Sequence, residues 1–480
     1  MVHVVAYNAV STLVQTLDRI PQHLWKNVAE VCVFDDHSPD QTHLIGHGYR
    51  AHRDLHNLHI FRNPENLGYG GNQKLGYRYA IDKGFDYVVL LHGDGQYAPE
   101  EMESLLKPLI DGEADAVFGS RMLDKGRARQ GGMPLYKWVG NRILSNLQNE
   151  LLGMNLSEFH SGYRAYRVSA LESIPFEANS DDFHFDTQII IQLMAGGHRI
   201  REVPIPTYYG DEICHVNGMK YAKDVMRSVF EFRRHRAGLV SLPEYSHVSL
   251  PRYEEKESPL SSHQKLVQRV RPGSKVLDVG CASGYLATQL KAKGCEVVGV
   301  DVMQNDAGAD ACDRYFVADL EQPWTPGEDG FDYIIFGDII EHLRNIDIVD
   351  RCRGWLSPQG RVLASTGNVA LWYIRLQLAI GRFDYTPRGI LDETHVKLYT
   401  RKTFRELFTT LGYRVEHEDF TTIPFERLLD RVVAGTPVAK LTHLVEEAGY
   451  RLARLWPELM AYQIVLELTE ARSRRSMPLP

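Results

Sequence analysis

The sequence lacks the features that define several large protein classes. Its six cysteines include no C-x-x-C pair, so neither a zinc knuckle nor a disulfide framework is indicated, and a reducing cytoplasm is expected. The formal net charge of -8 argues against a nucleic-acid partner, because neutralising phosphates requires a basic face. No apolar run approaches the ~18 residues of a membrane span, and Met1 leads into a strand-like run without a signal peptide. We expect a soluble cytoplasmic protein, at most peripheral at the inner face of a membrane.

The chain of 480 residues is too long for one ordinary core and predicts two globular domains. Strand-like runs alternate with helical stretches twice, first in VHVVAY, EVCVFDD and DYVVLLHGD, and again in KVLDVG, EVVGVD, RYFVADL, FDYIIFGD and GRVLAST. This rhythm is typical of parallel α/β sheets. Residues 241–263 are rich in Pro, Ser and charge and are interpreted as a linker. We therefore predict domains at 1–240 and 264–470, with a disordered tail at 471–480.

The stretch VLDVGCASGYLATQLKAKGCEVVGVD, residues 276–301, predicts a nucleoside pocket. Gly280 and Gly284 leave room for a ligand at a strand-to-helix turn, and Asp301 ends the next strand where a ribose diol would lie. The spacing is G-x-x-x-G rather than the G-x-G-x-x-G of pyrophosphate sites. The carboxylate of Asp278 would repel phosphate and attract ammonium. The pattern therefore favours S-adenosylmethionine over a dinucleotide; a ligand-free doubly wound turn is the alternative.

In the first half, polar residues follow three strand-like runs, where open α/β sheets bind ligands. Asp35 and Asp36 end the second run, where a carboxylate can accept hydrogen bonds from a base N–H and a ribose hydroxyl. Glycines 68, 70 and 71 precede a helix and would let backbone approach a ligand. His92, Asp94 and Gln96 alternate on one turn, a spacing that suits a divalent ion, Mg2+ or Mn2+, bridging a diphosphate. Solvated caps are the alternative.

These motifs give the first 235 or so residues a resemblance to family 2 glycosyltransferases, closest to the dolichyl-phosphate mannose synthase branch. The matching segments are AYN (6–8), FDDHSPDQT, ENLGYGG, HGDGQYAPE, FGSRM (118–122), MPLYKWVGNRI (133–143) and HSGYRAYR (160–167). The resemblance implies a GT-A-type fold and a nucleotide-sugar donor. It also implies roles for residues of these motifs: Asp35 or Asp36 at the base, Asp94 and Gln96 at the metal with Asp94 catalytic, Arg121 at the diphosphate, and Tyr7, Gly71 and Arg164 at the substrate.

The chain departs from the family pattern at two positions. His92 stands where the family usually has Asp, and Ala9 stands where an acid often follows the AYN motif. His92 can ligate a metal without adding negative charge, which would give a weaker or more Mn-like site; a purely structural histidine is the alternative.

The acceptor is indicated partly by what is missing. No Q-x-x-R-W element occurs, whereas family members that glycosylate a sugar hydroxyl often carry one and need a base. A polyprenyl phosphate is already ionised and needs none; an envelope saccharide is the other acceptor considered. Residues 138–152 place Trp138, Ile143, Leu144, Leu147, Leu151 and Leu152 along an approximate helical stripe. That stripe fits either contact with a membrane surface or a core helix.

Residues from about 264 to 469 resemble class I S-adenosylmethionine-dependent methyltransferases, which have a Rossmann-like fold. The motifs are VLDVGCASGYL, VVGVD, FVADLEQPW, FDYIIFGDIIEHL and LSPQGRVLAST, in the order that this fold requires. The resemblance implies contacts with the cofactor along the sequence, namely Asp278, Gly280 and Gly284 at its methionine end, Asp301 at the ribose, Asp319 at the adenine, and Asp338, Glu341 and His342 at its methyl face.

Methyl transfer depends chiefly on placement of the nucleophile, and a base assists where the acceptor is a hydroxyl. His342 and His395 are the candidate bases, and a structural role is the alternative for each. We predict a bifunctional enzyme that transfers a sugar from a nucleotide sugar and methylates a saccharide or related small molecule. A methyltransferase joined to a degenerate, ligand-binding first domain is a second hypothesis. A methyltransferase for nucleic acid or protein is disfavoured by the acidic charge.

Overall fold

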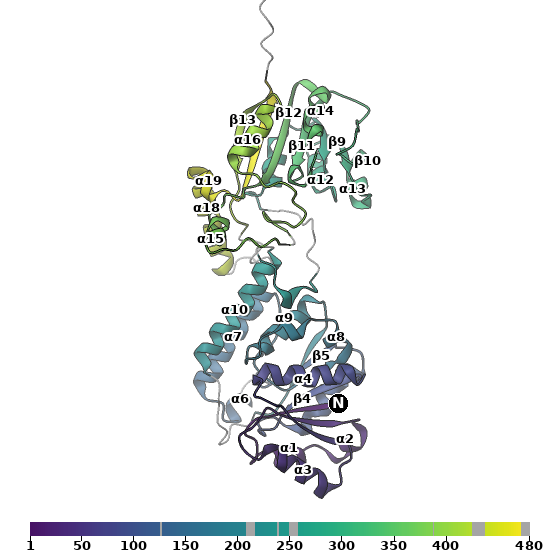
Figure 1. Cartoon of the computed structure of the whole chain (residues 1–480), viewed down its shortest axis with the longest axis vertical. Coiled ribbons are helices and arrows are strands. Elements are labelled where there is room, and N and C mark those ends of the chain that lie inside the picture. The colour runs from purple at the N-terminus through teal and green to yellow at the C-terminus, as the bar shows by residue number, and fades with distance from the viewer. Residues whose placement is uncertain are drawn as a thin grey trace, which may run out of the picture. The chain divides into compact units, whose positions relative to one another are not determined.

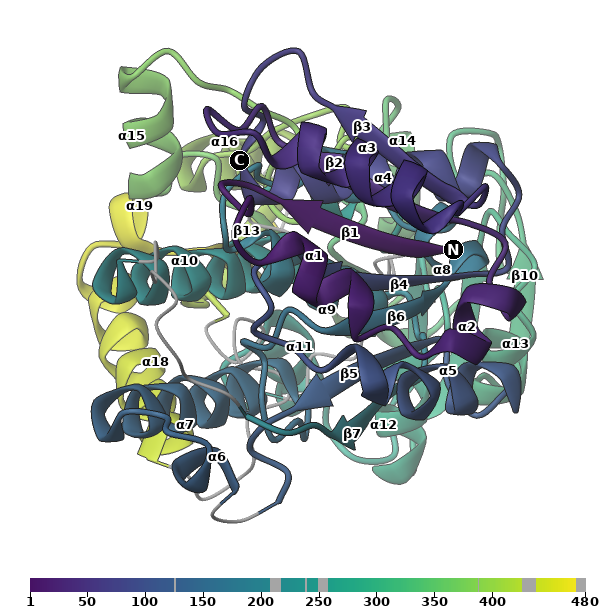
Figure 2. The ribbon, with the colours of Figure 1, turned by 90° about the horizontal axis from the view of Figure 1, so that it is seen from below.

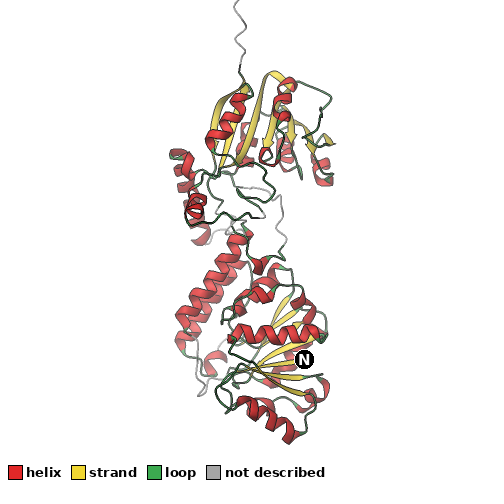
Figure 3. Ribbon diagram, in the orientation of Figure 1, coloured by secondary structure: helices red, strands yellow, loops and turns green. Residues whose placement is uncertain are grey.

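The computed structural model describes residues 1–124, 127–207, 217–237, 240–248, 258–386, 388–424 and 437–471. The chain divides into two compact units, one containing Met1–His235 and the other most of the described residues from 258 onward. Each unit is a seven-stranded sheet with helices packed on it (Figures 1 and 3).

The first unit contains the strands β1 Val2–Ala6, β2 Val31–Asp35, β3 Leu58–Arg62, β4 Tyr87–His92, β5 Ala116–Ser120, β6 Arg164–Arg167 and β7 Ile200–Pro204. Their order across the sheet is β3-β2-β1-β4-β6-β5-β7, which can be followed from one side of the sheet to the other in Figure 2. Strands β3, β2, β1 and β4 are parallel, β6 is antiparallel to both neighbours, and β7 is parallel to β5. The parallel strands therefore all end at one edge.

The helices of this unit are α1 Leu13–Asp18, α2 Gln22–Asn27, α3 Thr42–Arg53, α4 Gly68–Asp82, α5 Met102–Ile110, α6 Arg127–Gln130, α7 Leu135–Leu152, α8 Val168–Glu172, α9 Phe185–Ala195 and α10 Gly218–Arg236, with short 3-10 turns η1 Pro99–Glu101, η2 Phe176–Ala178 and η3 Pro243–Tyr245. Successive strand residues face opposite sides. Val2 and Val4 join a core with residues of α1, α3 and α5, whereas His3 contacts Tyr77 of α4 on the other face. Both faces of the sheet are thus covered by helices.

The second unit contains β8 Lys275–Val279, β9 Glu296–Asp301, β10 Arg314–Val317, β11 Phe331–Gly337, β12 Leu356–Gly367, β13 Tyr413–Phe420 and β14 Gln463–Glu470. The order is β10-β9-β8-β11-β12-β14-β13. The first five of these strands are parallel, and β14 runs antiparallel between β12 and β13. The sheet reverses its winding at β8, which places a topological switch point at the end of that strand.

The helices of the second unit are α11 Ser262–Arg269, α12 Tyr285–Ala292, α13 Asp306–Ala311, α14 Asp347–Arg351, α15 Trp372–Ala379, α16 Arg401–Thr410, α18 Pro437–Leu455 and α19 Pro457–Met460, with 3-10 turns η4 Ile340–His342 and η5 Cys352–Trp355. Val276 packs in a core with residues of α11 and α12, and Leu277 packs in a second core with residues of α14 and α16. Neighbouring residues of β8 therefore pack on opposite faces of the second sheet, and helices cover both faces.

The predicted linker is shorter than residues 241–263. Tyr245 in η3 is 1% exposed and its ring meets Phe232 of α10, so residues around η3 pack on the first unit. At the other end, the hydroxyl of Ser261 accepts from the Gln264 N–H and caps α11. Residues 249–257 between these points, and the predicted tail from 472 onward, lie outside the described residues.

Helix α7 packs in the core at its end and exposes apolar side chains at its beginning, and its contact with a membrane surface stays a prediction. Leu151 and Leu152 are buried core residues, whereas Ile143 is 62% exposed. Its first turns also expose Leu135, Tyr136 and Val139. Across the described residues, no helix has both the length and the apolar character needed to cross a bilayer.

Candidate functional sites

The strand registers bring the predicted residues of the first unit to one edge of its sheet. Ala6 pairs with Asp35, and Val5 pairs with His92. Tyr7, which follows β1 and is 46% exposed, therefore leaves the sheet between the ends of β2 and β4. The carboxyl ends of parallel strands are where such sheets bind ligands.

The two neighbouring aspartates at the end of β2 have different surroundings, because successive side chains point to opposite faces. Asp36 accepts hydrogen bonds from the Asn63 side chain at 2.8 Å and from the backbone N–H groups of Leu67 and Gly68 at 2.8 and 3.0 Å. Its carboxylate therefore holds the glycine turn. Asp35 is fully buried, and its Oδ2 has no hydrogen-bond partner. Of the two aspartates, Asp35 is the one with an acceptor oxygen left for a ligand.

The glycine turn at the start of α4 packs against the protein's own backbone. A Cβ on Gly70 would lie 2.4 Å from the Ser180 carbonyl oxygen, and one on Gly71 would lie 2.9 Å from the Cβ of Leu67. Gly70 also donates its N–H to the carbonyl of Asp181 at 2.7 Å. Residues 180–181 thus make the close approach at Gly70, and Leu67 makes it at Gly71. The structure gives Gly71 a packing role, and its substrate role stays a prediction.

His92 and Asp94 face different environments on the turn after β4. The Nε2 of His92 lies 3.2 Å from the Tyr69 hydroxyl, which lies 3.0 Å from Oδ2 of Asp186. Because the carboxylate takes the tyrosine proton, Nε2 of His92 carries a proton and donates to Tyr69. Burial also lowers the pKa of this half-buried histidine. Nε2 of His92 is thus engaged in a hydrogen bond within the protein, and the geometry does not support this nitrogen as a metal ligand.

Asp94 is exposed, and its Oδ1 accepts from the Gln96 backbone N–H at 3.0 Å. This turn fixes the direction of the carboxylate and brings Gln96 beside it. A carboxylate and an amide oxygen are ligands that Mg2+ and Mn2+ accept. Asp94 and Gln96 thus fit a divalent ion, with the remaining ligands left to water and to a diphosphate.

Two arginines that we predicted at the substrate are engaged inside the protein. Arg164 is 1% exposed and donates to the carbonyls of Ser161, Phe159 and Asp186 at 2.8 to 3.0 Å. Its antiparallel strand β6 carries it into the sheet interior, so its predicted substrate role is corrected to a structural one.

Arg121 forms an ion pair with the buried Glu158, whose side chain also accepts from Asn141 at 2.7 Å. Burial alone would raise the pKa of Glu158, but Arg121 holds it below its ordinary value. The positive charge of Arg121, which we expected to contact the diphosphate, is therefore balanced by Glu158. Its contact with a diphosphate stays a prediction.

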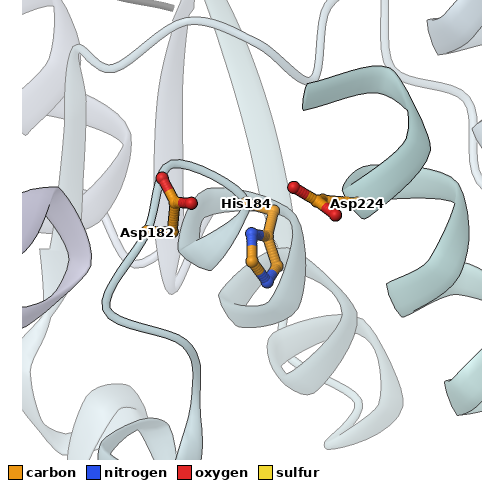
Figure 4. A group of neighbouring side chains, drawn as sticks. All are labelled: Asp182, His184 and Asp224. Atoms are coloured by element: carbon orange, nitrogen blue, oxygen red, sulfur yellow. The ribbon is translucent and has the colours of Figure 1, made fainter. Parts of the chain in front are cut away.

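A separate cluster brings together Asp182, His184 and Asp224, whose ligand atoms lie within 4.8 Å of one another. Figure 4 shows that they come from the turn before α9 and from α10. The ammonium of Lys220 lies 2.5 Å from Asp182 and 3.3 Å from Asp224. The Lys220 ammonium already pairs with both carboxylates and offsets one of their two negative charges, so the proximity of these groups does not require a metal.

The second unit forms the predicted turn at its switch point. Gly280 and Gly284 have φ of +78° and +75°, a region that glycine enters without strain. Asp301 ends β9 and accepts from the backbone N–H groups of Ala282 at 2.9 Å and Met303 at 3.2 Å. These bonds fix a half-buried carboxylate beside the turn, as a ribose diol requires.

Asp278 is 1% exposed, and its Oδ2 has no hydrogen-bond partner. Burial, together with the nearby charge of Asp301, raises its pKa to about 7. An unpaired buried carboxylate is costly and is stabilised by a positive group. The site therefore fits the ammonium of an amino-acid-bearing nucleoside.

The other acids predicted at the cofactor differ in availability. Asp319 is exposed, and its Oδ1 accepts only a short turn bond from Glu321 N–H at 2.9 Å among the contacts described. Asp338 instead accepts from the side chains of Ser365 at 2.6 Å and Gln463 at 2.7 Å. These contacts stabilise its positive φ of +54° and tie β11 to β12 and β14. These contacts give Asp338 a structural role, and its cofactor role stays a prediction.

The two candidate bases, 53 residues apart, are in contact. The rings of His342 and His395 meet edge to face with centroids 4.7 Å apart. His395 donates from Nδ1 to the Ile390 carbonyl at 3.0 Å. The Nδ1 of His342 lies 3.1 Å from the Thr394 hydroxyl, which donates its own proton to Asp392 at 2.6 Å. Both rings are therefore fixed with a protonated Nδ1, and each can present Nε2 as a proton acceptor.

This histidine pair borders the cofactor turn. His342 ends η4, and Ile339 just before η4 lies so close to Gly280 that a Cβ there would be 2.7 Å from Ile339 Cγ1. Burial, followed by the charge of His395, lowers the pKa of His342. A neutral imidazole at neutral pH is the state that a general base requires.

Comparison with known proteins assigns a family to each of the two units. Residues 1–174 match the model of glycosyl transferase family 2, and residues 252–418 match a methyltransferase domain. An undecaprenyl-phosphate mannosyltransferase of Micrococcus luteus is 31% identical over 205 residues, which are 42% of this chain and 79% of the relative. The chain belongs to glycosyl transferase family 2. It joins this glycosyltransferase to a methyltransferase, and both the GT-A-type and the Rossmann-like fold are as predicted.

Further similarities extend across both units. A polyprenol monophosphomannose synthase of Mycolicibacterium smegmatis is 30% identical over 176 residues, covering 36% of this chain and 65% of the relative. Among solved structures, glucosyl-3-phosphoglycerate synthase from Mycobacterium tuberculosis aligns at TM-score 0.37 and 19% identity, covering 48% of this chain and 76% of that one. A SAM-dependent methyltransferase from Archaeoglobus fulgidus aligns at TM-score 0.29 and 17% identity, covering 43% and 90%.

Sequence reasoning missed several partners of these sites. Asp186, which orders Tyr69 and His92, lies 117 residues from Tyr69. Glu158 balances Arg121, and His43 and Arg62 lie beside Asp35. An acid two residues before HSGYR and a basic residue ending β3 are visible in the sequence, but only the fold shows what they face.

Proposed function

We propose that the glycosyltransferase unit transfers a sugar from a nucleotide-sugar donor to a polyprenyl phosphate, with a divalent cation at Asp94 and Gln96. The observation that carries this proposal is the buried oxygen of Asp35 that lacks a hydrogen bond, at the same sheet edge as exposed Tyr7 and Asp94. Asp35 would bind the base and Tyr7 would border it. The cation, when bound, neutralises charge on the departing diphosphate. An ionised lipid phosphate needs no protein base, and a mannosyltransferase with an undecaprenyl-phosphate name is among the relatives.

Transfer of radiolabelled sugar from a panel of nucleotide sugars to undecaprenyl phosphate in detergent tests this proposal. We expect transfer with Mn2+ or Mg2+, its loss in EDTA, and a drop of about 100-fold or more in Asp94→Asn. Transfer by His92→Asn should depend on metal concentration as transfer by wild type does, because Nε2 of His92 donates to Tyr69 and is not a metal ligand. Donor binding without transfer to any acceptor would instead support the degenerate first domain and refute glycosyl transfer.

We propose that the second unit binds S-adenosylmethionine and methylates a hydroxyl of a saccharide. The ammonium would pair with Asp278, the ribose would bind Asp301, and Asp319 would reach the adenine. The contacting pair His342 and His395, each with Nδ1–H engaged, supports removal of a hydroxyl proton by Nε2. The cofactor supplies the methyl group at its sulfonium; the protein's part is to orient the acceptor and accept a proton.

Tritium transfer from methyl-labelled S-adenosylmethionine to methyl hexosides and to undecaprenyl-phosphate sugars tests this role. His395→Gln should lower kcat by about 100-fold or more while leaving the Kd for S-adenosylmethionine within about twofold. Burial and the charge of His395 lower the pKa of His342, so a rate that requires neutral His342 should rise with pH below 6.5 and level off there, and His342→Gln should lose that rise. An unchanged pH profile in His395→Gln and in His342→Gln would rule out base catalysis by the pair.

A further inference from the structure

Two helices of the second unit expose apolar side chains, which together are called the apolar face. On α18 the exposed residues are Leu444, Val445, Ala448, Leu452, Leu455 and Trp456. On α15 and the turn after it they are Trp372, Leu376, Leu378, Ile380 and Phe383. Arg375 of α15 donates to the Glu458 carbonyl of α19 at 3.2 Å, and Figures 1 and 2 both show α15, α19 and α18 in succession along one side of this unit.

The orientation of α18 is the reverse of that of an ordinary surface helix. Leu444, Leu452 and Leu455 recur at helical spacing and share one side, and Leu455 is 80% exposed. Glu446 and Ala453, on the opposite side of the helix, are buried. The apolar stripe of a surface helix normally packs on the core, whereas here the leucines face outward. A contiguous exposed apolar surface of this kind marks a binding surface.

Arginines without an acidic partner border the apolar face. Among the residues that the structure describes, no carboxylate oxygen lies within ion-pair distance of Arg375, Arg382 or Arg454. Residues 370–383 contain two of these arginines and no acid, in a chain whose formal net charge is -8. Uncompensated positive charge is therefore found where apolar side chains are exposed.

The acids on these elements leave a positive excess. Glu458 pairs with Arg401, and Glu447 lies 3.6 Å from Arg451, so Asp384 is the exposed acid that remains to oppose the three arginines. A symmetric dimer through this face would bring like charges together. An anionic lipid surface matches both properties, because its headgroup boundary takes up Trp, Phe and Leu side chains and its charge attracts arginine.

We propose that the apolar face binds the surface of an anionic phospholipid bilayer and holds the second unit at a membrane. On its buried side, α15 packs through Ile374 on Ile390, and the Ile390 carbonyl accepts from His395 at 3.0 Å. The bilayer therefore lies beside the segment that positions a candidate base. This inference adds a partner to the second unit, and vesicle binding does not depend on either transfer reaction.

Sedimentation of the full chain with phosphatidylcholine vesicles, with and without phosphatidylglycerol, tests this inference. We expect binding to be at least about tenfold tighter with phosphatidylglycerol and to weaken in high salt, because arginines near an anionic surface add to the affinity and salt screens them. Leu376→Asp combined with Leu455→Asp should weaken binding at least about tenfold. Ile110→Asp, at a 62% exposed apolar residue of the first unit, should bind as wild type does. Unchanged melting temperatures show that these variants fold.

Tryptophan fluorescence locates the contact. Trp372 and Trp456 belong to the apolar face, so lipids brominated on their acyl chains should quench wild type, and Trp372→Phe combined with Trp456→Phe should lose most of the quenching. Equal quenching in that variant, or equal affinity for the two kinds of vesicle, would overturn the inference. So would undiminished binding by the double aspartate variant or no binding by wild type. Self-association of wild type that the double aspartate variant abolishes would assign the face to a second copy instead.

Discussion

Among the residues that the structure describes, two aspartates, one in each unit, have a buried oxygen without a hydrogen bond. Such a group costs about 1 to 3 kcal/mol when nothing satisfies it, and both Asp35 and Asp278 lie where a parallel strand ends. Other acids at the same strand ends, Asp36 and Asp338, are satisfied by protein donors. At the scale of the residue, the unpaired buried oxygens of Asp35 and Asp278 mark these two carboxylates as candidates for a ligand.

Asp278→Asn should stabilise the ligand-free second unit at pH 8 and abolish S-adenosylmethionine binding. The pKa is raised from 3.8 to about 7 by folding, so the native state binds more protons between these values and stability falls as pH rises through this window. At about 1.4 kcal/mol per pKa unit, the ionised carboxylate costs the native state roughly 4 kcal/mol at most. Melting temperatures of wild type and variant should differ at pH 8 and converge near pH 4. Glu296→Gln, at an exposed acid, should show no such divergence, and a less stable Asp278→Asn at pH 8 would contradict the argument.

The sequence predicted elements better than it predicted their partners. The strand, turn and helix around Gly280 follow from local pattern, and so do the acid-bearing ends of β2 and β4. The direction of β6 does not, because it depends on pairing with β4 and β5, which are distant in the chain. The antiparallel pairing of β6 is what buries Arg164. The motif HSGYRAYR contains this arginine but does not indicate the direction of its strand.

The glycine turn before α4 provides a prediction at the scale of the element. A Cβ on Gly70 would meet the Ser180 carbonyl at 2.4 Å and Phe185 Cβ at 2.8 Å, and neither backbone nor a packed ring can yield easily. Gly70→Ala should therefore destabilise the first unit by about 1 to 3 kcal/mol, the usual cost of overpacking. Gly140→Ala in α7 meets nothing within 4 Å and should stabilise by roughly 0.5 to 1 kcal/mol through helix propensity. Urea unfolding of both variants measures the contrast, and equal effects would show that the turn has no packing role.

At the scale of the whole molecule, the two units have separate cores and separate sheets, which predicts that they respond to their ligands independently. Calorimetric scans of the full chain should show S-adenosylmethionine raising one transition and a nucleoside diphosphate with Mn2+ raising another. A ligand at 100 times its Kd adds about 2.7 kcal/mol, which corresponds to several degrees for units of this size. Asp301→Asn should cancel only the first shift and Asp35→Asn only the second. A single transition that either ligand raises would mean that the two units unfold together.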